Sequence, residues 1–437
     1  MTGPSTSLTE TAFFERLQSL NMPKRFAAAV SGGRDSMALA RMCAAYAEKT
    51  GAKCLALTVD HGLRAEAGEE AAKVKTWCEA AGLDHRTLRW EGDKPRSGVQ
   101  AAARFARYRL LIEAAQENGC EALLTAHSED DQAETLFMRL SRGAGLKGLA
   151  AMRAESLVAA GADAPMRLLR PLLSFSRESV TAWLHEIGQD YLDDPSNLDE
   201  RFERVRVRAL LAALAEQGLL AGASLAASAE KLALAEDAAR AQEEALLGHL
   251  GGCFYPWGGV SLDRWDGKVP GAAGLARRLI HAAGGGEYPA EESAALEAIK
   301  KASSERAATL GGALIRGWKT RLWFLREPAA LTGRAGVAPM TAQPLTGPVL
   351  WDRRFVIAPN DPSGNLEIAP LGAQGAGLLG PRACLFRGPA EGLAAQPGLW
   401  RQGVLIGAPA LPFMDTRNVT CRSLLQERFD GRIVRFS

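Results

Sequence analysis

The amino-acid sequence predicts an α/β fold, in which a doubly wound parallel sheet is followed by a helical domain and a small C-terminal domain that is α+β or β-rich. Between residues 26 and about 140, short apolar runs alternate with patterns long enough for helices. After about residue 215 the chain becomes alanine-rich and helical, and its last part is rich in glycine, proline and short strand-like pieces. In such a sheet a ligand is expected at the carboxyl ends of the strands.

Four apolar runs predict the strands of the sheet. Three of them are typical of buried strands and one of a more exposed strand; they are FAAAV (26–30), KCLALTV (53–59), EALLTA (121–126) and, more exposed, HRTLRW (85–90). The helices are predicted between and after these runs, at residues 36–48, 66–81, 98–117 and 129–141.

Changes of composition along the chain predict three domains. The first domain is expected at residues 1–215 and a second, helical domain at 216–327. Residues 328–348 contain four prolines and little periodicity, which predicts a linker to a small domain at 349–437. No internal repeat is visible.

Composition indicates a folded globular protein. Of 437 residues, 47% are apolar and 23% charged, and the formal net charge is only +2, so bulk charge does not indicate nucleic acid. The seven cysteines include no CxxC pair, which favours reduced thiols and argues against structural zinc or an iron-sulfur centre. With no signal-peptide pattern and no long apolar span, we expect a cytoplasmic protein without membrane association.

The string SGGRDS follows the first predicted strand and opens the first predicted helix. A Ser-Gly-Gly turn at this place points several backbone N–H groups toward one position, at the positive end of a helix dipole, which suits an anion such as phosphate. The ordinary alternative is a tight turn with Asp35 or Ser36 as helix cap. The candidate anion-binding residues are Ser31, Gly32, Gly33, Arg34, Asp35 and Ser36.

Two other glycine patterns are weaker. Residues 143–148 fit GxGxxG, but they follow a predicted helix where a dinucleotide-binding motif follows a strand. Residues 312–320 approach a P-loop string, but Trp318 interrupts its Gly-Lys pair, so a turn is predicted there.

The SGGRDS string resembles the PP-loop of the N-type ATP pyrophosphatases, which cleave ATP between the α and β phosphates and leave AMP on an acceptor. Further motifs fall at the expected ligand edge: VDHGLR (59–64), AARFARYRLL (102–111), a block at 125–149 and the arginine-rich 193–211. Together they resemble the tRNA(Ile)-lysidine synthetase family over residues ~24–212. Ala67 and Ser128-Glu129 depart from that family's usual residues, at positions with no catalytic role assigned here.

The resemblance implies a PP-loop ATPase fold of the adenine nucleotide α-hydrolase type and an ATP- and Mg²⁺-dependent ligase. Free L-lysine would be joined to C2 of the wobble cytidine of tRNA(Ile) with a CAU anticodon, through an adenylated tRNA, with release of AMP and diphosphate. The resemblance also implies that residues 1–215 form the catalytic domain and that the helical domain at 216–327 binds tRNA. A homodimer is left open.

The chemistry selects the candidate catalytic residues. Attack of a cytidine O2 on the α-phosphate requires cations around the phosphates, and addition of an amine requires carboxylates and a base. The candidates are Asp35, Arg104, His127, Asp131 and Glu134, with Asp60 and His61 as further ATP-binding residues and Asp35 and Asp131 as Mg²⁺ ligands.

Each candidate has a structural alternative. Asp131 and Glu134 lie three residues apart and are also what a helix N-terminus attracts. His127 could cap that helix, Asp60 and His61 could be turn residues, and Arg104 could stack over Tyr108 one helical turn away.

Basic residues gather near the predicted active edge and form a candidate tRNA-binding surface, with a solvated face as the alternative. They are Arg139, Arg142, Lys147, Arg201, Arg204 and Arg208. The spacing of Arg204, Arg206 and Arg208 is not helical, which weakens the case for one shared partner. In the last domain, Trp351, Arg353, Arg354 and Phe355 are predicted to be ordinary strand residues rather than an RNA contact.

Three other functions fit these motifs less well. A tRNA thiolase of the nearest kind usually has paired CxxC cysteines, which this sequence lacks. An amidotransferase-type synthetase does not share the HGLR and RGAGxxGL strings. A non-catalytic tRNA-binding protein would have no need of an intact SGGRDS with Asp131 and Glu134.

Overall fold

The computed structural model describes residues 7–62, 67–91, 99–159, 165–193, 199, 201–265, 267–286, 288–304, 307–333, 338–361, 364–414, 419–431 and 433–435. The chain forms two compact units, one made mainly of residues up to Asp237 and the other mainly of Ala238–Ile433. In the described residues no helix is long and apolar enough to cross a membrane.

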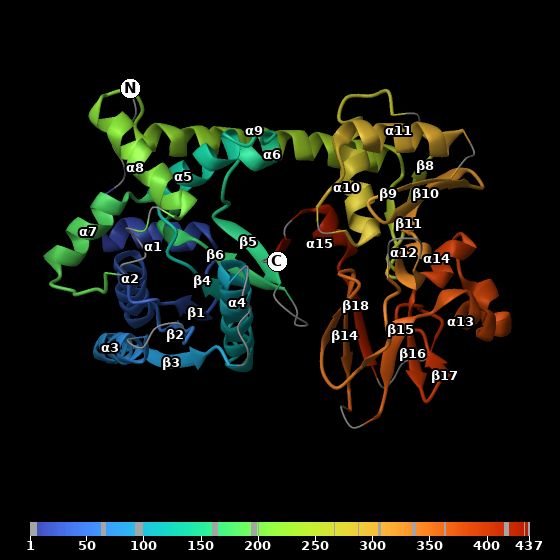
Figure 1. Ribbon diagram of the computed structural model, residues 1–437, viewed down its shortest axis with the longest axis horizontal. Coiled ribbons are helices and arrows are strands. Elements are labelled where there is room, and N and C mark those ends of the chain that lie inside the picture. Colours follow the sequence, from blue (N-terminus) through green and yellow to red (C-terminus); the bar gives the residue numbers. More distant parts are fainter. Residues whose placement is uncertain are drawn as a thin grey trace. The chain divides into compact units, whose positions relative to one another are not determined.

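The first unit contains the predicted α/β sheet (Figure 1). Its seven strands lie in the order β19-β5-β6-β4-β1-β2-β3, with bounds β1 Arg25–Ala29, β2 Lys53–Asp60, β3 Asp84–Arg89, β4 Ala122–Leu124, β5 Glu155–Ala159, β6 Met166–Leu169 and β19 Ile433–Arg435. Strands β1, β2, β3, β4 and β6 pair in parallel. The four predicted strands are confirmed within a few residues.

One strand of this sheet departs from the expected parallel arrangement, because β5 pairs antiparallel with β6. Glu155 lies opposite Leu169 and Val158 opposite Met166. The short connection between the two strands leaves no room for a crossover helix, so the chain can only return in the opposite direction. Neither strand was predicted from the sequence, because both are short.

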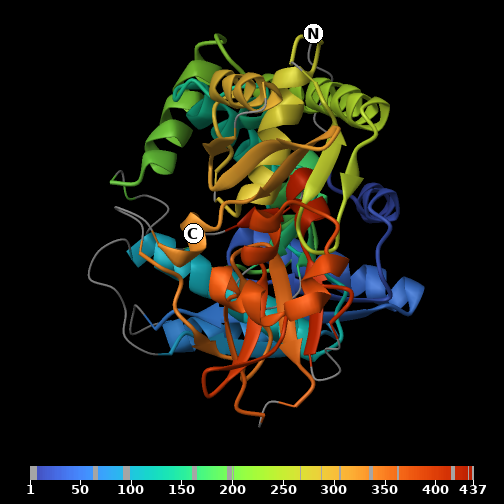
Figure 2. The same cartoon turned by 90° about the vertical axis from the view of Figure 1, so that its right-hand side faces the viewer.

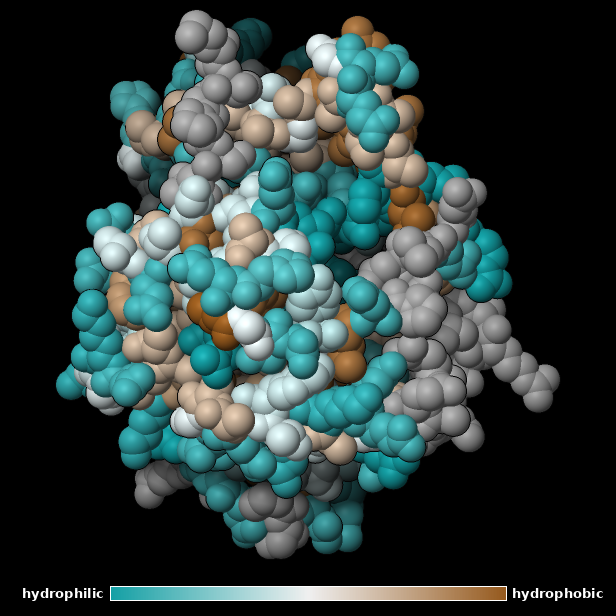
Figure 3. Space-filling view, turned by 90° about the vertical axis from the view of Figure 1, so that its left-hand side faces the viewer, coloured by the Kyte–Doolittle hydropathy of each residue, from teal (hydrophilic) through white to brown (hydrophobic). Residues whose placement is uncertain are grey.

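Helices cover both faces of the sheet. The helices of the first unit are α1 Glu10–Ser19, α2 Arg34–Thr50, α3 Ala67–Ala80, α4 Val99–Glu117, α5 Glu129–Leu140, α6 Leu146–Leu149, α7 Arg177–Glu186 and α8 Glu203–Glu216, with the short 3-10 helix η1 at Pro171–Ser174. The long helix α9, Gly222–His249, begins in this unit and ends in the other. The face that carries α7 and α3 is mostly hydrophilic (Figure 3).

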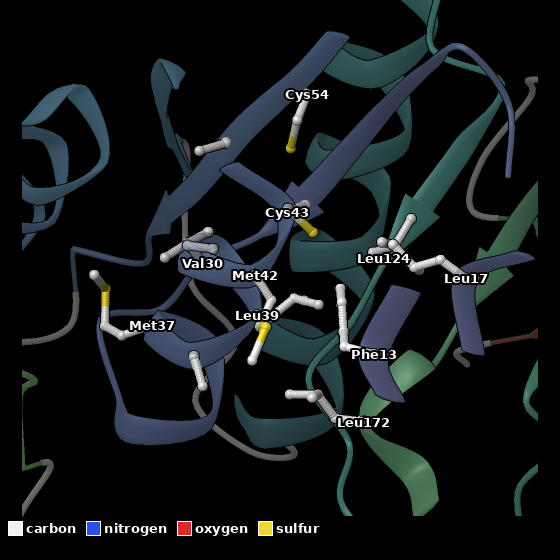
Figure 4. Packing of buried hydrophobic residues seen from close by; sticks show 14 of the residues in the cluster. Phe13, Leu17, Val30, Met37, Leu39, Met42, Cys43, Cys54, Leu124 and Leu172 are labelled. Carbon is white, nitrogen blue, oxygen red and sulfur yellow. The ribbon is translucent and has the colours of Figure 1, made fainter. Parts of the chain in front are cut away.

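Alternation along the strands divides the core between the two faces. Phe26 and Ala28 of β1 belong to a buried cluster with α1, α2 and α7, whereas Ala27 between them packs with α4. Figure 4 shows the first cluster, in which Phe13 of α1, Leu39 of α2 and Leu124 of β4 lie together with further apolar side chains. This two-sided burial confirms the doubly wound fold.

The second unit contains a five-stranded antiparallel sheet, in the order β7-β8-β11-β10-β9. Its strands are β7 Cys253–Phe254, β8 Val260–Asp263, β9 Ala308–Leu310, β10 Ala313–Trp318 and β11 Arg321–Arg326. Helices α10, Ala272–Gly284, and α11, Glu292–Ser303, pack on it and appear as gold ribbons in Figure 2. The domain predicted to be helical at 216–327 is helical at α9, α10 and α11, but it also contains this sheet, which the sequence did not predict because its strands are short.

Two smaller sheets complete the second unit. One has the order β12-β15-β16-β17 and the other β13-β14-β18. The strand bounds are β12 Gln343–Pro344, β13 Val349–Trp351, β14 Phe355–Pro359, β15 Glu367–Pro370, β16 Pro397–Arg401, β17 Val404–Gly407 and β18 Val419–Ser423. The helices are α12 Ala329–Thr332, α13 Gly372–Leu378, η3 Gly380–Leu385, α14 Ala390–Ala394 and α15 Leu425–Phe429.

Aromatic residues at the start of the last segment belong to the core. Trp351 and Phe355 are fully buried, and Arg354 is 1% exposed. The Arg354 guanidinium donates to the Asp352 carboxylate at 2.6 Å and to the Ala395 carbonyl at 2.9 Å. These side chains are therefore structural, as predicted, and present no aromatic surface for RNA.

Candidate active site

The Gly-Gly turn between β1 and α2 has the conformation that its sequence predicts. Gly32 has a φ of +88°, which side chains with a Cβ rarely adopt. A Cβ there would lie 2.6 Å from both Leu192 and Val74. The Leu192 N–H donates to the Gly32 carbonyl at 2.9 Å, and Gly33 forms a parallel bridge with Leu192. Leu192, which is distant in sequence, therefore fixes the turn through these contacts.

The first amides of α2 are left without a side-chain cap. Gly33 is the N-cap residue and offers no side chain to accept a hydrogen bond. The Ser36 hydroxyl, which is buried, donates to the Gly33 carbonyl at 2.8 Å and accepts from the Ser31 N–H at 3.1 Å. Ser36 therefore stiffens the turn instead of capping the helix, and the uncapped amides suit an anion.

Arg34 and Asp35 follow in the first turn of α2. Their side chains form an ion pair, with 3.0 Å between Arg34 Nε and Asp35 Oδ1. Both are partly exposed, so a ligand can reach them. The other Asp35 oxygen lies 3.9 Å from Nε of Arg177, which comes from α7.

Asp60 and His61 lie at the carboxyl end of β2, next to β1 in the sheet. The Asp60 carboxylate is 8% exposed, accepts from the Gly62 N–H at 2.7 Å and lies 3.7 Å from Arg89 Nε. The His61 ring meets Trp90 edge-on, with 6.1 Å between centroids. Asp60 therefore stabilises its own turn, and His61 packs against Trp90.

The start of α5 carries an ionised carboxylate at the same edge of the sheet. Asp131 accepts from the Ser128 N–H at 2.9 Å, as in a capping box, and its other oxygen lies 3.3 Å from Arg204 and 3.5 Å from Arg177. Desolvation raises the pKa of Asp131, but Arg204, His127, the Ser128 N–H and Arg177 together lower it below its ordinary value. Asp131 therefore caps the helix and presents a charge to the site.

His127 is held as a neutral imidazole. Its Nδ1 lies 3.0 Å from the Thr125 hydroxyl. Burial lowers the pKa of His127 to about 3. The nearby arginines Arg170, Arg204 and Arg104 also lower this pKa, whereas Asp131 raises it. A neutral ring can accept a proton, although its basicity is low.

Glu134 is almost fully enclosed by arginines. It is 2% exposed and receives hydrogen bonds from Arg204 Nε at 2.7 Å and Arg208 Nε at 2.8 Å, with Arg177 at 3.4 Å. Both arginines from α8 are therefore anchored to α5 by one buried carboxylate. This arrangement leaves the oxygens of Glu134 little room for another partner.

Arg177, which was not predicted from the sequence as a site residue, contacts four carboxylates. They are Asp35, Asp130, Asp131 and Glu134, at 3.9, 4.0, 3.5 and 3.4 Å. Desolvation lowers the pKa of Arg177, but these carboxylates outweigh it and raise the pKa overall. A signal was present in the sequence: a cation in the first turn of a helix opposes the helix dipole, so an arginine there needs another reason.

Arg104 lies on α4 above Tyr108, with 5.5 Å from the guanidinium carbon to the ring centroid. Tyr108 is 1% exposed and belongs to the core. Desolvation lowers the pKa of Arg104. Tyr108 raises this pKa, whereas Arg107 and Arg204 lower it further. Its electrostatic coupling to Arg204 and His127 places Arg104 in the same basic environment as the start of α5.

The other basic candidates divide into anchored and exposed residues. Arg139 donates to the carbonyls of Gly148 and Ala151, both at 2.9 Å, and so fixes the loop around α6. Arg142 pairs with Glu203, and Arg201 with Asp199 at 2.6 Å, and both arginines are exposed. Lys147 is exposed on α6.

The structure thus brings Asp35, His127, Asp131 and Glu134 together around Arg177 and Arg204. Ser31, Gly32, Gly33, Arg34 and Ser36 form the adjoining turn, and Asp60 and His61 lie on the neighbouring strand. Part of the HGLR string (63 and 64) and part of the arginine-rich block (194–198 and 200) lie outside the described residues.

The chain is similar to known proteins over most of its length. A family model of the PP-loop domain matches residues 7–214. The tRNA(Ile)-lysidine synthase of Ruegeria pomeroyi is 37% identical over 404 residues, which are 90% of this chain and 90% of that protein. The chain belongs to the tRNA(Ile)-lysidine synthase family.

Other members of the lysidine synthase family match similarly. The synthase of Mesorhizobium japonicum is 36% identical over 416 residues, covering 90% of this chain and 86% of that protein. That of Rhodopseudomonas palustris is 50% identical over 192 residues, covering 44% of this chain and 54% of its own. A solved U34-tRNA thiolase, NcsA from Methanococcus maripaludis, matches 51% of the chain at 18% identity and a TM-score of 0.44, too low to inform function.

Proposed function

We propose that the protein joins free L-lysine to C2 of the wobble cytidine of tRNA(Ile) with a CAU anticodon, consuming ATP and releasing AMP and diphosphate. Membership of the lysidine synthase family supports this activity. The observation that carries it is the meeting of an uncapped glycine turn, which suits phosphate, with the ionised carboxylate of Asp131, which suits an amine. The proposed reaction needs both a turn that binds phosphate and a carboxylate that binds an amine.

In the first step, O2 of the cytidine attacks the α-phosphorus of ATP and diphosphate leaves, so that AMP is carried by the base. The amides of the Gly32–Gly33 turn and the first turn of α2 would bind phosphate oxygens. Arg104 and Arg34 would neutralise charge that develops on those oxygens. Ser36 keeps the turn in shape through its bond to the Gly33 carbonyl.

In the second step, the ε-amine of lysine attacks C2 of the activated ring and AMP leaves. The nitrogen must lose a proton, and neutral His127 is the candidate acceptor, with Asp131 holding an ammonium group of the substrate. Glu134 acts in this proposal through Arg204 and Arg208, which it holds in place.

Mg²⁺ fits the residues at the site. Asp35 and Asp131 both lie within 4 Å of the Arg177 guanidinium, so the two carboxylates approach a common position. Among the described residues no group of three or more His, Cys, Asp or Glu side chains forms a cage for a metal. Mg²⁺ commonly shares its ligands between one or two carboxylates and substrate phosphates. Held by Asp35 and Asp131, it would neutralise charge on ATP.

For the tRNA, the exposed side chains of Arg142, Lys147 and Arg201 are the proposed phosphate contacts. Arg204 and Arg208 would act closer to the reacting base, and Arg139 would act through the loop that it fixes. We expect a cytoplasmic enzyme, in the compartment of its tRNA.

The test is a direct assay of the wobble nucleoside. Purified protein is incubated with ATP, Mg²⁺, lysine and transcripts of CAU-anticodon isoleucine and methionine tRNAs. The mass of the wobble nucleoside is then measured by mass spectrometry. We expect one lysine to be added to the isoleucine transcript only, with AMP as the nucleotide product. Sulfur incorporation would indicate a thiolase, and the absence of diphosphate release with any tRNA would indicate a binding protein; either result rejects the proposal.

A further inference from the structure

Arg177 stands out because its position is unfavourable for its own helix. It is the first residue of α7, after the N-cap Ser176, where the dipole of the helix disfavours a positive charge. Its side chain is only 16% exposed, so it is not there for solvation. Contacts outside the helix must therefore account for an arginine at this position.

These contacts link elements that carry the two halves of the proposed reaction. Asp35 comes from the phosphate-binding end of α2, whereas Asp130, Asp131 and Glu134 come from α5. In addition, the backbone N–H of Arg177 donates to Asp130 at 2.6 Å, which fixes the start of α7 against α5. One guanidinium thus holds the two helix starts in a single arrangement.

We propose that Arg177 is a positioning residue. It serves as the counter-ion of these four carboxylates and holds Asp35 and Asp131 at a fixed separation before ATP and its metal ion bind. The inference rests on the proposed function for its place in the reaction. The four carboxylates are balanced by four arginines when Arg177 is present, since Arg34 pairs with Asp35, Arg204 with Asp131 and Arg208 with Glu134. Without Arg177, carboxylates from two elements would face each other with too few cations.

A metal-binding measurement separates this role from a merely structural one. In Arg177→Gln, the uncompensated carboxylates should bind a divalent cation with no nucleotide present. Titration with Mn²⁺ alone, followed by electron paramagnetic resonance, should give at least a tenfold lower Kd than for the wild type. The matched control is Arg86→Gln, which removes the same charge from an exposed pair with Glu117 elsewhere in the first unit. Its Mn²⁺ affinity should equal that of the wild type.

Kinetics provide the second readout. Arg177→Gln should lower kcat for lysidine formation at least about tenfold, because Asp35 and Asp131 lose their common partner. Arg177→Lys keeps the charge but cannot span the carboxylates with a planar group, so it should show wild-type Mn²⁺ affinity with a reduced kcat. If Arg177→Gln does not fold, Arg177→Lys decides the matter by its kcat.

Three results would overturn the proposal: a folded Arg177→Gln variant with unchanged Mn²⁺ affinity, the same variant with unchanged kcat, or Arg177→Lys with wild-type kcat. The Mn²⁺ titration needs neither tRNA nor lysine. Failure of the proposed function would therefore appear as a lack of AMP and diphosphate from the wild type, and failure of this inference as unchanged metal binding.

Discussion

At the scale of single residues, Gly32 shows how a backbone conformation and a packing contact can demand the same residue. Its φ of +88° alone would disfavour a Cβ, and the 2.6 Å approaches to Leu192 and Val74 leave no space for one. Gly82 has nearly the same φ, +80°, but no atom lies within 4 Å of its ideal Cβ. The two glycines therefore separate the effect of strain from the effect of space.

We predict that Gly32→Ala abolishes diphosphate release, because the turn must move to admit the methyl group. Gly82→Ala should cost only the strain of a left-handed conformation, about 1 kcal/mol, and keep activity. Urea unfolding and a diphosphate-release assay measure the two effects. An active Gly32→Ala variant would show that the turn does not need its observed shape for catalysis.

His127 makes stability depend on pH. In the unfolded chain its pKa is about 6.5, and in the folded protein burial lowers it to about 3. Between these values the unfolded state binds more protons, so the free energy of unfolding falls as the pH decreases from 7 toward 3. The group contributes no such dependence above pH 7.

We predict that, between pH 7 and pH 5, the wild type loses about 2 kcal/mol more stability than His127→Gln, because the variant has no imidazole to protonate on unfolding. His185→Gln, which replaces an exposed histidine of α7, is the control and should behave like the wild type. Urea titrations at the two pH values give the result. Equal losses in wild type and His127→Gln would mean that His127 is not held neutral.

At the scale of elements, the start of α5 combines a helix cap with a charged group of the site. Asp131 accepts from the Ser128 N–H and also faces two arginines. The sequence alone allows two interpretations of Asp131, a first-turn acid or a catalytic carboxylate. In the structure the same side chain caps the helix and pairs with arginines of the site. A substitution that keeps the cap but removes the charge distinguishes their importance.

Asp131→Asn retains an oxygen for the Ser128 N–H, so we predict a loss of stability of only about 1 kcal/mol. Activity should fall at least about 100-fold, because an amide holds neither an ammonium group nor Mg²⁺ as a carboxylate does. Glu129→Gln removes a charge from the same helical turn and should leave activity unchanged. If both variants were equally active, Asp131 would be only a cap.

The sequence predicted elements best where the pattern was local. The SGGRDS string gave the turn and the start of α2 within two residues, since glycine conformation and helix capping are decided by near neighbours. Partners distant in the chain were not predictable: Leu192 behind the turn, Arg177 between the carboxylates and the arginines of α8 on Glu134. The short strands β5 and β6 were not predictable either, because each forms only by pairing with the other.

At the scale of the whole molecule, the net charge is only +2, so binding of tRNA must depend on where particular exposed basic residues lie. Arg142, Lys147 and Arg201 are exposed near the ends of α5, α6 and α8. Their proposed role is electrostatic, so it must appear in the dependence of tRNA binding on salt. Each phosphate contact contributes about 0.7–0.9 to the slope of log K against log salt.

We therefore predict that replacing Arg142, Lys147 and Arg201 together by glutamine lowers this slope by about 2–3 and weakens tRNA binding most at low salt. The control triple, Lys75, Arg86 and Arg109 to glutamine, removes the same charge from exposed pairs with glutamates in the same unit and should change the slope little. Filter binding at several salt concentrations gives both slopes. If the two triples lowered the slope equally, the effect would come from overall charge, and these basic residues would not be where the tRNA phosphates bind. A large drop in the first triple alone, with diphosphate release restored by excess tRNA, would assign them to binding and leave the chemistry to the residues around Asp35 and Asp131.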